Sequence, residues 1–328
     1  MAKLSPQERV YLAKKRLFAV LERHTVANAR TLEQKISDAG PFGQRIDPHV
    51  LTEVRNDLVK TGELVRDKHA NAPWFYLGNS PIQAVLERLN EQLPIYEALL
   101  QPTLSRRVGQ ALEIATYRAL CLTEGCDFDG RYIDLDEHGD ELPYRKQEPS
   151  QHIGIRSLSG DERLDFIVRT PDAGPLGIEC KNVRHWLYPH VEEIKETLSK
   201  CIAIDAVPVL IARRIPYVTF HLLSRCGVIV HQTYNQLLPE SDAELAAKAK
   251  EKTLLGYHDI RLGNEPDARL KKFISKNMLS VAAQARARFE DNKDLLDDFG
   301  NRRIPYEEFA GRIRRRDQGL GDKWDPDP

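Results

Sequence analysis

Two acids and one amine fall at regular spacing on two β-prone runs in the middle of the chain. Asp165 lies in the first run, residues 163–170, and Glu179 and Lys181 lie in the second, residues 176–182, after a cluster of turn formers. Because side chains alternate between the faces of a strand, the three are expected to converge on one face of a β-hairpin. Two carboxylates beside an amine make a site for a hard divalent cation and a positioned water. The opposite face of the first strand would carry Leu164, Phe166 and Val168.

The order of an aspartate, a variable gap and Glu-x-Lys resembles the signature of the PD-(D/E)XK (restriction-endonuclease-like) nuclease superfamily. The gap here holds thirteen residues, 166–178. The resemblance implies that Asp165, Glu179 and the backbone carbonyl of Cys180 bind Mg²⁺, for which Mn²⁺ substitutes. It also implies that Lys181 holds or polarises the attacking water. The alternative is a surface hairpin with a cross-strand ion pair, which would contribute little stability.

The segments on either side of this hairpin are expected to complete such a core. Periodicity and apolar runs predict helices at 104–122, 191–202 and 217–225, and strands at 127–135, 207–212 and 227–231. With the hairpin, this order resembles the α/β (α+β) restriction-endonuclease-like fold, a mixed sheet flanked by helices. Several nuclease subfamilies carry a metal ligand on the first core helix, which makes Glu113 a fourth catalytic candidate. Its alternative is a surface glutamate that pairs with a basic neighbour.

The N-terminal segment predicts three helices followed by a hairpin. The helices are expected at 7–23, 31–39 and 47–62, and the strands at 63–66 and 74–78. This order resembles a winged helix-turn-helix domain over residues 7–78, which implies a third helix in the DNA major groove and a hairpin on the backbone. The DNA-binding candidates are Thr52, Arg55, Asn56 and Lys60 on that helix, and Arg66, Lys68 and His69 on the hairpin. The alternative is a module that only packs or dimerises.

Four segments follow from these patterns: a winged-helix domain at 1–79, a helical connector at 80–103 interrupted at Pro94, a nuclease core at 104–240, and a helical C-terminal extension at 241–328. Within the core, residues 136–160 are polar and rich in turn formers, so they are expected to form an insertion. The composition, 41% apolar and 30% charged, is that of a soluble globular protein. The chain has no apolar run of about 18 residues and no apolar leader, which predicts no membrane span. Five cysteines without framework spacing predict free thiols in a reducing cytoplasm.

The sequence therefore predicts a Mg²⁺-dependent DNA endonuclease that acts on double-stranded DNA, in restriction or genome defence. Dependence on modified bases, the recognition sequence, the strand polarity and the number of metal ions are left open. Because duplex cleavage needs two active sites or two visits, a homodimer is favoured. A repair or recombination nuclease on branched DNA and a non-enzymatic winged-helix DNA-binding regulator are the alternatives. The net charge of −1 separates none of these.

Overall fold

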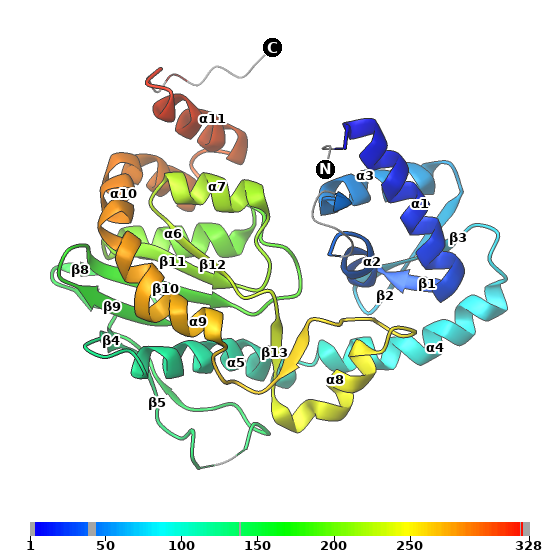
Figure 1. The fold of residues 1–328 in the computed structure, drawn as a ribbon, viewed down its shortest axis with the longest axis horizontal. Helices are drawn as coiled ribbons and strands as arrows, with labels where there is room; N and C mark the ends of the chain where they lie inside the picture. Colours follow the sequence, from blue (N-terminus) through cyan, green and yellow to red (C-terminus); the bar gives the residue numbers. More distant parts are fainter. Residues whose placement is uncertain (1–3, 39–43, 138, 322, 324–328) are drawn as a thin grey trace. The chain divides into compact units, whose positions relative to one another are not determined.

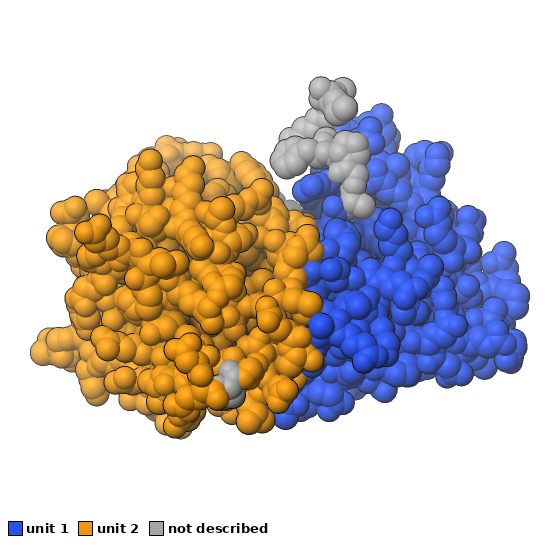
Figure 2. All heavy atoms as spheres, turned by 60° about the horizontal axis from the view of Figure 1, so that its bottom comes forward, with its two compact units in different colours: residues 1–105, 242–260 blue, residues 106–241, 261–328 orange. Residues whose placement is uncertain are grey.

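The computed structural model describes residues 4–38, 44–137, 139–321 and 323, and has a mixed α/β fold with open sheets (Figure 1). The end of the helix predicted at 31–39 lies outside the described residues. The chain forms two compact units, coloured separately in Figure 2. Unit 1 comprises Met1–Ser105 and Asp242–Ile260, and unit 2 comprises Arg106–Ser241 and Arg261–Pro328.

Unit 1 contains a three-stranded antiparallel sheet with the order β1-β3-β2. Its elements are α1 (Pro6–His24), β1 (Val26–Asn28), α2 (Ala29–Ile36), α3 (Pro48–Lys60), β2 (Leu64–His69), β3 (Ala72–Leu77), α4 (Ile82–Leu99) and α8 (Ala243–Lys250). Helix α1 begins at a capping box formed by Ser5 and Glu8, which satisfies two free backbone N–H groups. Leu17, Leu51 and Phe75 lie in the shared core of this unit.

Helix α4 corrects one prediction, because it continues through Pro94 without an interruption. A proline in a helix removes one backbone hydrogen bond and bends the helix, but neighbouring contacts can offset that cost. Here Val85, Leu89 and Ile95 are buried along one side of the helix, before and after the proline. Packing on both sides of Pro94 therefore outweighs the local penalty.

Unit 2 is built on a five-stranded mixed sheet with the order β12-β11-β10-β9-β4. Its strands are β4 (Asp127–Asp129), β9 (Phe166–Thr170), β10 (Gly174–Lys181), β11 (Val207–Ala212) and β12 (Ile229–Gln232). The pairs β4–β9 and β9–β10 are antiparallel, whereas β10–β11 and β11–β12 are parallel. Short strands form three further two-stranded sheets. They are β5 (Arg131–Tyr132) with β6 (Lys146–Gln147), β7 (His152–Ile153) with β8 (Arg156–Ser157), and β13 (Gln236–Leu238) with β14 (Ile260–Leu262).

Helices α5 (Pro102–Cys121) and α6 (Glu192–Ala203) lie on opposite faces of this sheet (Figure 1). On the α5 side, the Cys180 thiol donates a 3.3 Å hydrogen bond to the hydroxyl oxygen of Thr116. On the α6 side, a Cβ at Gly177 would lie 2.8 Å from the sulfur of Cys201, so only glycine lets α6 approach this closely. Alternation along β10 consequently directs Glu179 toward α6.

The first strand of the central hairpin begins at Phe166 rather than at Arg163. The prediction that Leu164 shares a face with Phe166 and Val168 is wrong. Leu164 packs with Ile167 and Cys201 on the α6 side, while Phe166 and Val168 belong to the larger core cluster. The backbone leaves the regular strand at Asp165, so strict alternation does not extend to Leu164.

The C-terminal residues are divided between the two units. Residues 242–260, with α8, belong to unit 1, and residues from 261 onward belong to unit 2. The residues from 261 onward form α9 (Ala268–Lys272), a π-helical turn (Phe273–Asn277), α10 (Met278–Gly300) and α11 (Tyr306–Asp317). The remaining helix of unit 2, α7 (Tyr217–Arg225), comes earlier in the chain. Phe289, Phe299 and Phe309 are fully buried in the main cluster of unit 2, which makes these helices part of its core.

Candidate active site

Asp165 immediately precedes β9 and its side chain reaches the C-terminal end of β10. Its Oδ2 accepts a 2.6 Å hydrogen bond from the backbone N–H of Cys180, and its Oδ1 lies 3.4 Å from the Nζ of Lys146. Burial, together with the negative charges of Glu113 and Glu179, raises the pKa of this carboxyl to about 8, although Lys146 acts in the opposite direction. Burial, which opposes ionisation, is the largest cause of this rise, and the two neighbouring carboxylates add to it.

Glu179 lies on β10 between two ammonium groups. Its Oε2 is 2.9 Å from the Nζ of Lys181, and its Oε1 is 2.5 Å from the Nζ of Lys200 on α6. Burial acts to raise the pKa of Glu179, but the charges of Lys181 and Lys200 outweigh it and lower that pKa. Glu179 is therefore an ionised carboxylate, although only 3% of its side chain is exposed.

Lys181 follows two residues after Glu179 and faces the same side. Burial acts to lower its pKa, but the charges of Glu179 and Asp165 raise it well above the ordinary range of lysine. Lys181 is therefore a permanent cation at neutral pH. Such a group can hold a phosphate oxygen or orient a water molecule, but it is a poor general base.

Glu113 lies on α5 and reaches the same cluster from the other face of the sheet. Its Oε2 accepts a 2.8 Å hydrogen bond from the hydroxyl of Tyr132 and lies 2.8 Å from the Nζ of Lys146. Burial and the neighbouring Glu113 raise the pKa of Tyr132, which keeps the phenol protonated as a donor. Glu113 therefore pairs with a basic neighbour, as the alternative expected, and its charge also raises the pKa of Asp165. Its role as a metal ligand stays a prediction.

Two further lysines, Lys146 and Lys200, pair with the carboxylates of this site and were not predicted from the sequence. Lys146 lies on β6, inside the segment expected to be a polar insertion, and Lys200 lies on the inner side of α6. Their side chains are 6% and 15% exposed. No motif marks either residue, because each reaches the site through tertiary packing and not through spacing along the chain.

The donor atoms fit a hard cation in their chemistry. Mg²⁺ is bound by oxygen ligands, of which the protein often supplies only one or two carboxylates and water supplies the rest. Asp165 and Glu179 are such carboxylates, and the charge of Glu179 is one of the causes that raise the pKa of Asp165, after burial and the charge of Glu113. In the part of the chain that the structure describes, however, no three His, Cys, Asp or Glu side chains are already grouped as a metal site. The carboxylates are paired with lysines instead.

The DNA-binding candidates on α3 differ in exposure. Thr52, Asn56 and Lys60 are exposed, whereas Arg55 is 5% exposed. The Nη2 of Arg55 donates to the Oγ1 of Thr52 at 2.8 Å, and its guanidinium lies 5.1 Å from the centre of the Phe75 ring. Arg55 therefore connects α3 to β3 and is not displayed on the surface.

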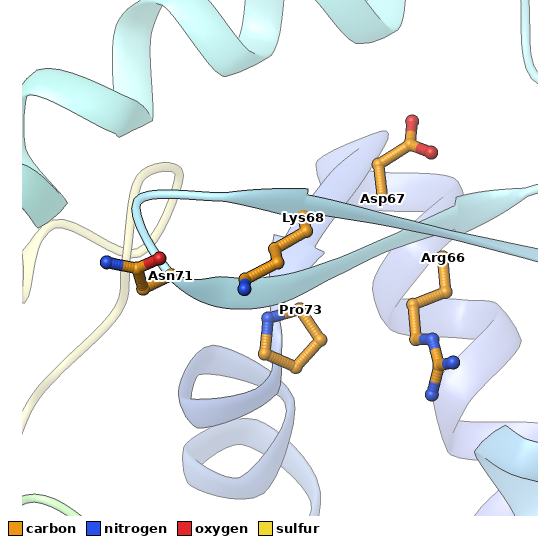
Figure 3. A pocket seen from close by; sticks show the side chains of 5 residues that line it. All are labelled: Arg66, Asp67, Lys68, Asn71 and Pro73. Carbon is orange, nitrogen blue, oxygen red and sulfur yellow. The ribbon is translucent and has the colours of Figure 1, made fainter.

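The hairpin of β2 and β3 displays the other candidates. Arg66 and Lys68 are exposed and His69 is half-buried. Ala70 and Asn71 form the turn with φ of 47° and 59°, a conformation typical of two-residue hairpin loops. A hollow of about 370 Å³ is lined by Arg66, Asp67, Lys68, Asn71 and Pro73, and Figure 3 shows Arg66 and Lys68 on the side of the hairpin opposite Asp67. This side presents two adjacent cations to solvent.

Comparisons with protein-family models, with curated proteins and with solved structures find no match for this chain. None of the helices within the described ranges combines a bilayer-spanning length with a sufficiently apolar sequence.

Proposed function

We propose that this chain is a Mg²⁺-dependent endonuclease that hydrolyses phosphodiester bonds in double-stranded DNA. The observation that carries the proposal is the meeting of Asp165, Glu179 and Lys181 at one end of the central hairpin, with Glu113 close enough to act on Asp165. A surface hairpin with one ion pair would not bury these charges together. Such clusters of perturbed ionisable groups are more frequent at functional sites than elsewhere.

The topology of unit 2 supports the same proposal. Its element order, α5, β4, β9, β10, α6 and β11, and its mixed sheet are similar to the core of the restriction-endonuclease-like fold. In unit 1, the order of three helices and three short strands, with the sheet order β1-β3-β2, is similar to a winged helix. We infer from this pair of similarities a DNA-engaging unit joined to a nuclease unit.

The cation would be held by Asp165 and Glu179, with Glu113 and the backbone carbonyl of Cys180 as further oxygen donors. When bound, Mg²⁺, or Mn²⁺ in its place, neutralises charge on the phosphate and lowers the pKa of a bound water. The protonated Lys181 is fixed by Glu179 and would hold the attacking water or a phosphate oxygen. Because the cluster is largely shielded from bulk water, each of these charge interactions is stronger than it would be on the surface.

DNA engagement would use the exposed residues of unit 1. Thr52, Asn56 and Lys60 on α3 are exposed and would contact a groove, and Arg66 and Lys68 on the hairpin are exposed and would contact phosphates. Arg55 would act indirectly, by holding α3 against β3. Phosphate contacts of this kind give affinity for any duplex, and base contacts from α3 would give sequence preference.

Plasmid cleavage with Mg²⁺ tests the proposal. Wild-type protein is expected to cut, whereas Asp165→Asn and Lys181→Met lose activity by a factor of about 100 or more, as for a general catalytic group. Lys195→Gln serves as the control, because Lys195 lies on α6 but pairs with Glu192 at 2.9 Å. Equal cleavage by all four proteins would refute the assigned roles.

The choice of DNA substrate distinguishes the finer alternatives. Preferred cleavage of a junction over a linear duplex would indicate repair or recombination, and preferred cleavage of unmethylated or of methylated duplex would indicate restriction or genome defence. Duplex binding without cleavage under Mg²⁺ or Mn²⁺ would favour a regulator instead. The proposed homodimer is tested by the molar mass of the protein on DNA.

A further inference from the structure

The ammonium group of Lys146 lies in the middle of the acidic cluster. Its Nζ is 2.8 Å from Glu113 Oε2, 3.4 Å from Asp165 Oδ1 and 3.5 Å from Glu148 Oε2. The other two lysines of the site pair with Glu179. Lys146 is therefore the cation that balances the Asp165 and Glu113 side of the site.

The position of Lys146 is fixed by the surrounding structure. The two residues before it are tied down: Gln110 on α5 donates to the carbonyl of Tyr144 at 2.7 Å and accepts from its N–H at 2.9 Å, and the Arg145 N–H donates to Asp134 at 2.9 Å. The Lys146 ammonium also lies 4.9 Å from the centre of the Phe166 ring, within range of a cation–π interaction. These contacts hold the backbone of this segment so that the Lys146 ammonium lies beside the carboxylates, and only 6% of the Lys146 side chain is exposed.

We propose that the Lys146 ammonium and a divalent cation are alternative counter-ions for Asp165 and Glu113, so that Lys146 sets the cation concentration at which the site fills. The inference rests on the proposed function, because it takes Asp165 as a cation ligand. Two positive charges at the same carboxylate oxygen repel each other, so the ammonium withdraws as the cation enters. The flexible four-carbon stem of lysine permits this movement without a change in the backbone.

Glu148 provides the place to which the ammonium withdraws. Its carboxylate is already within 3.5 Å of the Lys146 Nζ, and 46% of its side chain is exposed. A short rotation toward Glu148 would keep the ammonium paired and partly hydrated. The cost of moving the ammonium is therefore small compared with leaving it unpaired in a buried site.

Calorimetric titration of the full chain with Mn²⁺, without DNA, tests the inference. Lys146→Gln is expected to bind Mn²⁺ about tenfold more tightly than wild type, since one charge within about 4–6 Å shifts such equilibria by a factor of ten or more. Lys146→Arg keeps the charge, and Lys195→Gln removes a lysine outside the site, so both should bind as wild type does. Without divalent cations, Lys146→Gln should also melt at a lower temperature than wild type, and Mn²⁺ should narrow this gap.

The outcomes separate this inference from the proposed function. If wild type and Lys146→Gln bind Mn²⁺ equally and Asp165→Asn does not bind it, the role of Lys146 is refuted and the metal site stands. If wild type binds no Mn²⁺, the metal site and the role of Lys146 fall together. Should Lys146→Gln not fold, Glu148→Gln at its exposed position provides the second test. Loss of the outer partner of the ammonium should weaken Mn²⁺ binding, and unchanged affinity would refute the inference.

Discussion

Replacing Glu179 by glutamine should destabilise the protein far more than the loss of one ordinary ion pair. Glu179 lies 2.9 Å and 2.5 Å from two ammonium groups, whose side chains are 19% and 15% exposed. The substitution leaves both lysines close together without their shared anion. Breaking a buried pair costs about 3–5 kcal/mol, whereas exposed pairs contribute about 0–1 kcal/mol.

The partial exposure of Lys181 and Lys200 places the expected cost at the lower end, about 3 kcal/mol, because each stem lets its ammonium move toward water. Urea denaturation of Glu179→Gln and wild type measures this difference. Glu192→Gln on α6 is the matched control, because the side chain of Glu192 is 56% exposed and pairs with Lys195 at 2.9 Å. Adding Lys200→Gln to Glu179→Gln should recover part of the loss. A loss no larger than that of the control would show that the cluster is not a tightly coupled ionic site.

Three further predictions concern other parts of the molecule. Burial opposes ionisation of Asp205, but hydrogen bonds from Lys293, Arg286 and Arg156 lower its pKa to about 2 from 3.8. The ionised carboxylate should therefore stabilise the protein by about 2 kcal/mol above pH of about 4, and this contribution should be lost as the pH falls to about 2. The acid denaturation curve of Asp205→Asn should lack this loss. Gly177→Ala should cost about 1–3 kcal/mol in thermal denaturation because its Cβ would lie 2.8 Å from the Cys201 sulfur, and a second change, Cys201→Ala, should relieve part of this cost. Changing Arg66 and Lys68 together to glutamate should weaken duplex binding in a fluorescence-anisotropy titration, and the slope of log K against log salt concentration should become about 2 less steep. The control Lys248→Glu on α8 should leave both the affinity and this slope unchanged.

The sequence predicted the hairpin and the buried strands well because their signals are local. The strand at 207–212 has the predicted bounds, and its six residues are all buried, as expected for a strand covered on both faces. Glu179 and Lys181 lie on one face of β10 by strand alternation, whereas Asp165 lies just before β9 and is held by a hydrogen bond from the Cys180 N–H, which spacing along the chain does not indicate. The first strand starts at Phe166 and not at Arg163, and the second runs from Gly174 to Lys181 and not over 176–182, because nothing in these residues marks where the backbone joins or leaves the sheet.

Residues that depend on packing between distant segments could not be predicted in this way. Lys146 and Lys200 reach the site from a short strand and from the inner side of a helix, and neither position has a distinctive pattern around it. Arg55 was expected to be displayed for DNA contact, because an arginine on a helix is usually exposed. It is buried instead, and contacts Phe75 and Thr52. The α10 and α11 helices were expected to form an extension because nothing in their periodicity indicates which surface they cover.

Under the proposed function, the charges of the site predict that a cation and a DNA phosphate bind cooperatively. When all are ionised, the three carboxylates Glu113, Asp165 and Glu179 carry formal charges that cancel those of the three lysines Lys146, Lys181 and Lys200. A divalent cation would add two positive charges to this balanced group, and a phosphodiester brings one negative charge. Each ligand therefore reduces the electrostatic cost of the other, and the coupling must be reciprocal: DNA raises the affinity for the cation by the same factor by which the cation raises the affinity for DNA. A site with carboxylates alone would bind the cation more tightly, but without the cation it would repel the phosphate. Under the proposed function, the lysines would therefore favour binding of the metal when the DNA is present.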